Sequence, residues 1–254
     1  MKLIDLSGKT ALVTGGSRGV GRATAILLAR AGANVGISYR SRVKDAAETV
    51  HQIEAEGGHG WSFMADLSDE VDVLMLFQQV DREFTNGLDI FIANAAIWPV
   101  KDIPISKMST EQWRATMSIN LDAVFFNTKE ASKRIRKNGR IVFVGSTAGQ
   151  RGEAFHVDYA ASKGALMSMV KGLCVEFAPQ NITVNCVAPG WIDTEMAEPV
   201  FKNGVRENIA QGIPLKRIAT PEDVAGPILF LCSELARHIT GEVLNVNGGA
   251  VLCG

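Results

Sequence analysis

A tyrosine and a lysine four residues apart, Tyr159 and Lys163, are the side chains of this sequence best suited to proton transfer. On a helix this spacing places the phenol and the ammonium on one face. An unperturbed phenol, with a pKa near 10, exchanges protons poorly at neutral pH, and a neighbouring cation lowers that pKa. Lowering the phenol pKa by about three corresponds to roughly 4 kcal/mol of interaction that favours the phenolate over the neutral phenol. An isolated pair of this kind would be interpreted as a surface contact, so a catalytic interpretation depends on other residues of the sequence.

Two further polar residues support a catalytic interpretation. Ser146 follows a predicted strand over residues 140–145 and precedes Tyr159 by thirteen positions. Asn120 lies within a long predicted helix over residues 110–136, where an amide among apolar side chains needs a hydrogen-bond partner. Together these side chains predict a proton-transfer site, with the candidate catalytic residues Asn120, Ser146, Tyr159 and Lys163.

A glycine cluster lies near the start of the chain, in the run Thr14-Gly-Gly-Ser-Arg-Gly-Val-Gly21. Glycines allow backbone to approach phosphate closely, and the following helix offers unpaired N–H groups to a pyrophosphate. The spacing differs from Gly-x-Gly-x-x-Gly and lacks the Lys-Ser/Thr ending of a P-loop. An ordinary tight turn is the alternative, but the position between an apolar strand and an amphipathic helix favours dinucleotide binding.

The end of the second predicted strand indicates which dinucleotide. NAD-binding folds commonly place an acid there, whereas this chain has Ser38-Tyr-Arg-Ser-Arg42. Arg40 and Ser41, with Arg18 in the glycine loop, are suited to a 2′-phosphate. Each arginine alone would be interpreted as a solvated surface residue. Their convergence, and the absence of an acid, predict NADP(H).

The elements that position these residues alternate between apolar, β-branched runs and longer amphipathic stretches. Apolar strands separated by helices predict a parallel sheet covered on both faces. We expect an α/β fold, a single doubly wound Rossmann-type domain over residues 1–254 with about seven strands. Ligands in such folds bind beyond the carboxyl ends of the strands. Strands are expected at 9–14, 34–39, 61–65, 88–93, 140–145, 182–187 and 242–246. Helices are expected at 19–31, 70–84, 110–136 and 157–177, with a further helix that follows the second strand and ends at 56 and another that begins at 221. The segment 194–211 is expected to be an irregular or helical excursion.

Composition excludes several classes of protein. Hydrophobic residues make up 46% and charged residues 21%, which excludes intrinsic disorder. The net charge of -1 gives no basic excess for nucleic acid, and no apolar run is long enough to span a membrane. The four cysteines show no Cys-x-x-Cys spacing, and without a signal peptide we expect reduced thiols in the cytoplasm. No metal site is expected, and His59 is interpreted as structural or exposed.

These motifs resemble those of the short-chain dehydrogenase/reductase family. The glycine run resembles its glycine motif, and Asn120, Ser146, Tyr159 and Lys163 resemble its catalytic tetrad. Further matches are Asp66-Leu67, Asn94-Ala95, the segment 185–194 and the C-terminal segment 239–249. The chain departs from the family's Asn-Asn-Ala-Gly motif at Ala93 and Ala96. The first change would remove a sheet hydrogen bond, and the second would narrow the space beside the cofactor.

The resemblance implies reversible hydride transfer between NADP(H) and a carbonyl or secondary alcohol. Tyr159 would exchange the proton, Ser146 would bond the carbonyl oxygen, Lys163 would lower the Tyr159 pKa, and Asn120 would hold a relay water. The implied cofactor-binding residues are Gly15, Ser17, Arg18, Gly19, Val20, Tyr39, Arg40, Ser41, Asp66, Leu67, Asn94, Ala95, Ala96, Tyr159, Lys163, Pro189, Gly190, Ile192 and Thr194.

The sequence says less about the substrate. The loop 150–156, with Phe155, and the wall formed by Trp191 suit an apolar body, and the segment 194–211 is interpreted as a mobile lid. The chain most resembles 3-oxoacyl-[acyl-carrier-protein] reductases, which implies an acyl carrier protein or CoA thioester as partner. The basic residues Arg134, Arg136 and Lys137 are candidates for docking an acidic carrier, although Gln180 replaces a basic residue common in these reductases.

Two alternatives remain open. The motif Tyr39-Arg40-Ser41 also resembles sugar and polyol dehydrogenases of the same family. A non-catalytic dinucleotide-binding regulator is the remote alternative, because such proteins typically lose the tyrosine or lysine that this chain keeps. The family also implies a homotetramer, for which the surplus apolar positions would supply an interface. These positions are Val124, Phe125, Phe126, Leu166, Met167 and Met169.

Overall fold

The apolar runs of the sequence form a parallel sheet in the computed structural model, which describes residues 3–202 and 204–252. Every neighbouring pair of strands in this part of the chain is parallel. The order β3-β2-β1-β4-β5-β6-β7 reverses between β1 and β4, and the predicted doubly wound α/β class is confirmed. The strands are β1 Thr10–Val13, β2 Asn34–Tyr39, β3 Gly60–Met64, β4 Leu88–Ala93, β5 Ile135–Val144, β6 Thr183–Pro189 and β7 Val243–Val246.

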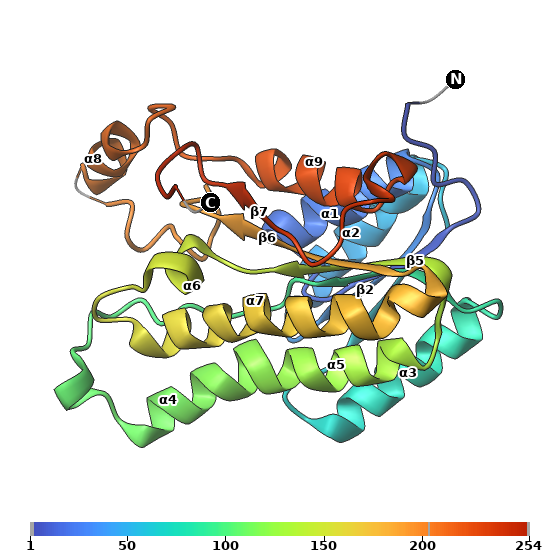
Figure 1. The fold of residues 1–254 in the computed structure, drawn as a ribbon, viewed down its shortest axis with the longest axis horizontal. Coiled ribbons are helices and arrows are strands. Elements are labelled where there is room, and N and C mark those ends of the chain that lie inside the picture. Colours follow the sequence, from blue (N-terminus) through green and yellow to red (C-terminus); the bar gives the residue numbers. More distant parts are fainter. Residues whose placement is uncertain (1–2, 203, 253–254) are drawn as a thin grey trace.

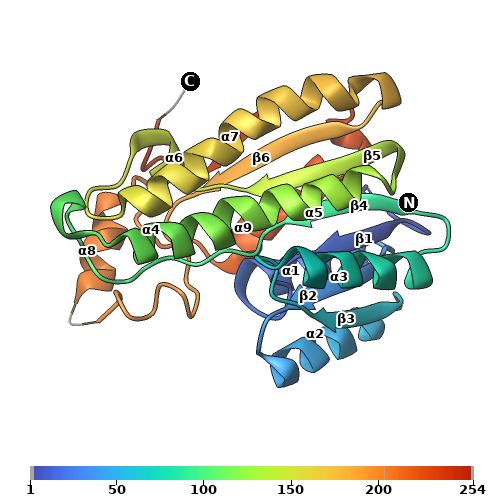
Figure 2. The ribbon, with the colours of Figure 1, turned by 90° about the horizontal axis from the view of Figure 1, so that it is seen from below.

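Helices cover both faces of the sheet (Figure 1). One layer contains α1, α2 and α9, and the opposite layer contains α3, α5 and α7, which Figure 2 shows from below. Each layer buries its own apolar cluster against the sheet, so β4 is buried over its whole length. The helices are α1 Gly19–Arg30, α2 Val43–Ala55, α3 Glu70–Glu83, α4 Thr110–Met117, α5 Ala123–Ser132, α6 Thr147–Arg151, α7 Val157–Phe177, α8 Val205–Gly212 and α9 Pro221–Leu231.

Local sequence accounts for the start of α9. Thr220 accepts from the backbone N–H of Asp223, and the Asp223 side chain accepts from the backbone N–H of Thr220, which forms a capping box. Pro221 occupies the first helical position, where its missing N–H costs nothing. Hydrogen bonds from Arg217 and from the backbone of Thr220 lower the pKa of Asp223 to about 2.

The predicted helix over residues 110–136 is wrong in two respects. A π-turn at Ser118–Asp122 divides it into α4 and α5, and α5 ends at Ser132. Ile135 already pairs with Leu88 as the first residue of β5, and the register then shifts between Leu88 and Ile90. Asn138, at φ 65°, accommodates this irregularity.

Candidate active site

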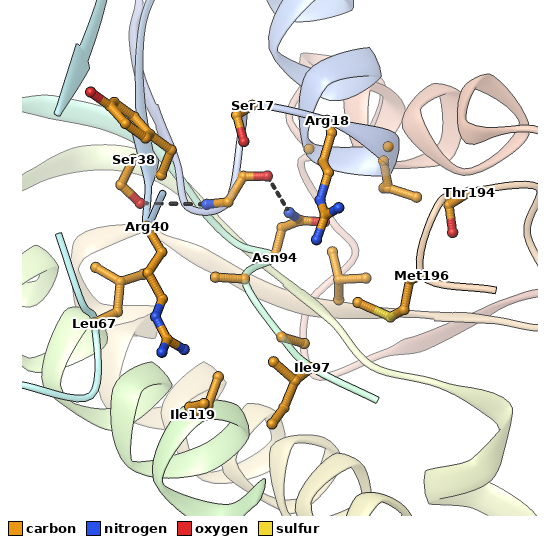
Figure 3. A pocket seen from close by; sticks show the side chains of 18 of the residues that line it. Ser17, Arg18, Ser38, Arg40, Leu67, Asn94, Ile97, Ile119, Thr194 and Met196 are labelled. Atoms are coloured by element: carbon orange, nitrogen blue, oxygen red, sulfur yellow. Dashed lines mark hydrogen bonds between the residues drawn. The ribbon is translucent and has the colours of Figure 1, made fainter. Parts of the chain in front are cut away.

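A cavity of about 510 Å³ lies at the carboxyl edge of the sheet, where the strand order reverses. Every residue predicted to contact the cofactor lines it, as does Ser146. Figure 3 shows side chains from the glycine loop, the ends of β2 and β4, and the segment after β6 surrounding one space. The topology therefore brings together motifs that are spread over most of the sequence.

The glycine loop is shaped to receive a phosphate. Gly15 and Gly19 adopt positive φ values of 65° and 53°, and a Cβ on Gly21 would lie 2.3 Å from the Gly15 carbonyl oxygen. Asn94 Nδ2 donates to that oxygen at 3.2 Å, and the Gly15 N–H donates to Ser38 Oγ at 3.4 Å (Figure 3). Arg18, at the N-cap of α1, makes no side-chain bond to the helix. The first turn of α1 thus has no side-chain cap competing with an anion, and these residues fit a dinucleotide.

Tyr159 stands on the first turn of α7, within the cavity lining. Burial disfavours the phenolate and raises the pKa of Tyr159, while interaction with the Ser146 side chain lowers it only in part. Ser146 itself is the N-cap of α6, and its Oγ accepts from the Ala148 N–H at 3.1 Å. Tyr159 is consequently a neutral phenol at neutral pH, the form that can donate a proton.

Lys163 lies one turn further along α7 and is buried. Its Nζ donates to the Val144 carbonyl oxygen at 2.8 Å, which fixes it against the end of β5. Burial lowers the pKa of Lys163 to about 8. The Nζ lies 5.9 Å from the centre of the Tyr159 ring. In the protein without cofactor, burial is the largest cause of the raised Tyr159 pKa, and the lowering of that pKa by Lys163 stays a prediction.

Asn120 does not line the cavity; it is fully buried behind it, in the π-turn. Its Oδ1 accepts from the Ile97 N–H at 2.8 Å, and its Nδ2 donates to the Ile97 carbonyl oxygen at 2.9 Å and to Ser162 Oγ at 3.3 Å. The side chain therefore holds the segment after β4 against α7. The predicted need of this amide for a partner is confirmed, and its partners are the Ile97 backbone and the Ser162 hydroxyl.

Ion pairs fill the other end of the cavity. Glu195 Oε2 lies 2.6 Å from an Arg18 nitrogen and 3.1 Å from an Arg42 nitrogen. Arg40 lies 3.5 Å from Asp66. Arg18, Arg40 and Ser41 all line the cavity as predicted, but the structure pairs each arginine with a carboxylate.

Arg42 and Glu195 also line the cavity and were not predicted as site residues. Arg42 belongs to the run that follows β2, and Glu195 follows Thr194 directly. Both could have been found by extending each motif by one residue. Ile97, Ile119 and Met196, which add apolar side chains to the cavity lining, were also not predicted.

Aromatic rings from three segments contact one another. The Trp98 ring centroid lies 5.6 Å from that of Trp191, in an edge-to-face arrangement, and 5.1 Å from that of His156. Trp191 also contacts Phe201 at 5.7 Å, in the segment predicted as a lid. Trp191 was predicted to form a wall of the substrate pocket; it joins this aromatic group but is not among the residues that line the cavity. Trp98 was missed because it lies four residues beyond Asn94.

The loop before α7 is exposed at Phe155 and buried at His156. Phe155 is 51% exposed, with φ 65°, and Arg151 pairs with Glu153 at 2.8 Å. His156 is buried, and its Nε2 lies 3.0 Å from an Asp102 carboxylate oxygen. His59, which was interpreted as structural or exposed, is exposed, and its Nε2 lies 2.8 Å from a Glu83 carboxylate oxygen.

The predicted basic docking patch is wrong. Arg134 precedes β5 and Arg136 lies at its start, whereas Ser146 follows the end of the same strand. Arg134 pairs with Asp81 and Glu130, and Arg136 pairs with Asp89. These arginines, with the adjacent Lys137, lie at the amino end of β5, away from the cavity, and both guanidinium charges are neutralised locally.

Other structural findings concern cysteines, metals and membranes. Cys174, Cys186 and Cys232 are free thiols, and Cys253 lies outside the described residues. Within 3–202 and 204–252, no cluster of His, Cys, Asp or Glu has the composition of a metal site. No helix in the same ranges has the length and apolar character needed to cross a bilayer.

Comparison with known proteins agrees with this geometry. A family model described as enoyl-(acyl carrier protein) reductase matches residues 15–251. The chain is 39% identical to 3-oxoacyl-[acyl-carrier-protein] reductase FabG of Aquifex aeolicus, over 97% of this chain and 98% of that protein. It is 35% identical to a short-chain dehydrogenase from Burkholderia cenocepacia solved with NADP, with a TM-score of 0.90 and coverage of 96% and 98%. Angucycline C-6 ketoreductase LanV, solved with bound NADP, is 35% identical, with a TM-score of 0.92 and coverage of 98% of each chain. The resemblance of the motifs is confirmed, and the chain belongs to the short-chain dehydrogenase/reductase family of oxidoreductases.

Proposed function

We propose that the substrate is a 3-oxoacyl thioester, which this NADP(H)-dependent ketoreductase converts to the 3-hydroxyacyl thioester. NADPH supplies the hydride when bound, and the protein supplies position and electrostatic field. The glycine loop and the first turn of α1 would hold the pyrophosphate, and Arg18, Arg40, Ser41 and Arg42 would bind the 2′-phosphate.

The catalytic side chains act on the carbonyl oxygen. Tyr159, which burial keeps protonated at neutral pH, donates its phenolic proton to that oxygen. Ser146 donates a hydrogen bond to the same oxygen and stabilises the developing alkoxide. Lys163, held by Val144, places an ammonium beside the phenolate that forms. Asn120 acts through position, because it holds the segment that carries Ile97 against α7.

The observation that carries the substrate proposal is the set of apolar side chains in the cavity that Tyr159 also lines. These are Ile97, Ile119 and Met196, and an acyl chain would bury apolar surface against them. A sugar would leave hydroxyl groups without partners against the same side chains, at a cost of about 1–3 kcal/mol each. The similarity to the Aquifex aeolicus reductase supports the same choice over the sugar or polyol alternative.

A paired assay tests this proposal. NADPH oxidation is followed with acetoacetyl-CoA, with an acetoacetyl carrier protein, and with a keto-sugar as the polar comparison. We expect turnover of at least one thioester and a much lower kcat/KM for the sugar. Turnover of the sugar alone would contradict the proposal, and turnover of any ketone would exclude the non-catalytic regulator.

The proposed assembly is a cytoplasmic homotetramer of single-domain chains spanning 1–254. Phe125 on α5 is 50% exposed, and Trp113 on α4 is 37% exposed, which leaves apolar surface on that layer. Val124, Leu166 and Met167 are buried in the chain's own core, so these three positions do not supply an interface as expected. Light scattering of the purified protein measures the assembly directly, and a monomer would contradict the proposal.

A further inference from the structure

Glu195 joins the segment after β6 to the glycine loop and to the loop that precedes α2. Its carboxylate is 47% exposed and bonds Arg18 from the glycine loop and Arg42 from the start of α2. Arg18 and Glu195 are 177 positions apart along the chain. Thr194, the preceding residue, packs close to the glycine loop, because a Cβ on Gly19 would lie 3.3 Å from its methyl group. Figure 3 shows Thr194 and Met196 on the same side of the cavity as Arg18.

The charges at this place favour an anion with more than one negative charge. Arg18, Arg22 and Arg42 gather near Glu195, and Asp45 pairs with both Arg22 and Arg42. Arg22 is further committed to the Ser17 carbonyl oxygen at 2.6 Å. Without the Glu195 carboxylate, the cluster would carry an excess of two positive charges, matched to a phosphate monoester dianion. Both groups offer oxygens to guanidinium nitrogens in the same way.

We propose that Glu195 is a specificity-determining residue whose carboxylate occupies the anion position of the cofactor 2′-phosphate, so that NADP(H) must displace it and NAD(H) need not. The carboxylate thereby lowers the affinity for NADP(H) and narrows the preference for NADP(H) over NAD(H). The arginine contacts also lower the pKa of Glu195, so the competing charge is present at neutral pH. This inference rests on the proposed 2′-phosphate site and is independent of the substrate.

Calorimetric titration of the full-length protein tests the inference without turnover. The ligands are NADP+, NAD+, adenosine 2′,5′-bisphosphate and AMP, and the last two isolate the 2′-phosphate from the nicotinamide. The variant is Glu195→Gln. Glu198→Gln is the matched control, because Glu198 is an exposed carboxylate in the same segment that lies three residues further on.

For Glu195→Gln we expect NADP+ and adenosine 2′,5′-bisphosphate to bind about fivefold more tightly, the scale of a partly exposed ion pair. NAD+ and AMP should change by less than about twofold, and Glu198→Gln should leave all four affinities unchanged. Weaker or unchanged binding of NADP+ to Glu195→Gln, or equal changes for NADP+ and NAD+, would overturn the inference. Glu195→Ala, which removes the amide as well, provides a second variant with the same expected direction.

The wild-type titration separates this inference from the cofactor-site proposal. If the wild-type protein binds adenosine 2′,5′-bisphosphate no more tightly than AMP, the proposed 2′-phosphate site and the inference both fail. If the wild-type protein prefers the bisphosphate but Glu195→Gln changes nothing, only the inference fails.

Discussion

The two ends of the cofactor cavity are built in opposite ways. At the catalytic end, Lys163 and Asn120 are buried and bonded to backbone atoms of Val144 and Ile97. At the phosphate end, Arg18 and Glu195 are 42% and 47% exposed and bond mainly to each other. The first arrangement is fixed by regular elements and the second by loops.

The difference follows from what each end must do. Proton transfer needs atoms held within hydrogen-bond reach and a low dielectric, which burial on α7 and at the end of β5 provides. Discrimination of a phosphate needs charges that can exchange partners with an incoming anion, which is easier where solvent screens them. We therefore expect large rate effects with little change in affinity at the catalytic end, and the reverse at the phosphate end.

The largest effect is expected for Tyr159→Phe. Removing the proton donor should lower kcat by about 10²–10⁴-fold. The ring remains, so the affinity for NADP+ should change by less than about twofold. Steady-state kinetics and calorimetry measure the two quantities separately, and a kcat within about tenfold of wild type would break the comparison.

The next effect is a pH dependence caused by Lys163. Its pKa of about 8 means that the ammonium is present below that pH and is lost above it. The kcat/KM for ketone reduction should therefore be level at lower pH and fall about tenfold per pH unit above the pKa. Lys163→Arg, whose guanidinium keeps its proton, should lower the plateau but remove this decline. A decline at the same pH in Lys163→Arg would assign it to another group.

A smaller effect is expected for Arg18→Gln. Loss of one charged hydrogen bond to the 2′-phosphate should weaken NADP+ binding by about tenfold, with NAD+ changed by less than about twofold. Arg30→Gln is the control, because Arg30 lies at the far end of α1 and pairs with Glu56. Equal losses for both coenzymes would show that Arg18 shapes the glycine loop instead.

The smallest effect is expected for Asp66→Asn. The Arg40–Asp66 pair is 3.5 Å long, and its side chains are 64% and 41% exposed. Such pairs contribute about 0–1 kcal/mol, so NADP+ affinity should rise by less than about threefold as Arg40 is released. A change of tenfold or more, in either direction, would mean that Asp66 contacts the cofactor through more than this pair.

The catalytic end was the easier one to predict from sequence, for a physical reason. Tyr159 and Lys163 share one helix, α7, whose predicted bounds of 157–177 match the structure. Ser146 follows a buried strand, and parallel topology then places it at the carboxyl edge. Both relations are local or follow from a general rule, so the residue spacing contains them.

The pairings at the phosphate end could not be predicted in this way. Glu195 meets Arg18 only after the chain has folded, and loop charges follow no period. The π-turn at Asn120 likewise depends on the backbone of Ile97, on another segment. The basic residues from Arg134 were placed in a helix for a similar reason. β5 begins with polar residues, and these suggested that the preceding helix continues.

The most direct test of this division between the two ends is one set of assays on three proteins. Wild type, Tyr159→Phe and Arg18→Gln are compared with acetoacetyl-CoA, each over a range of NADPH and of NADH concentrations that gives kcat and the coenzyme KM. We predict that Tyr159→Phe loses turnover with both coenzymes, whereas Arg18→Gln keeps the wild-type kcat and loses its preference for NADPH through KM alone. A fall in kcat for Arg18→Gln comparable to that for Tyr159→Phe, or a wild-type preference for NADH, would contradict the account.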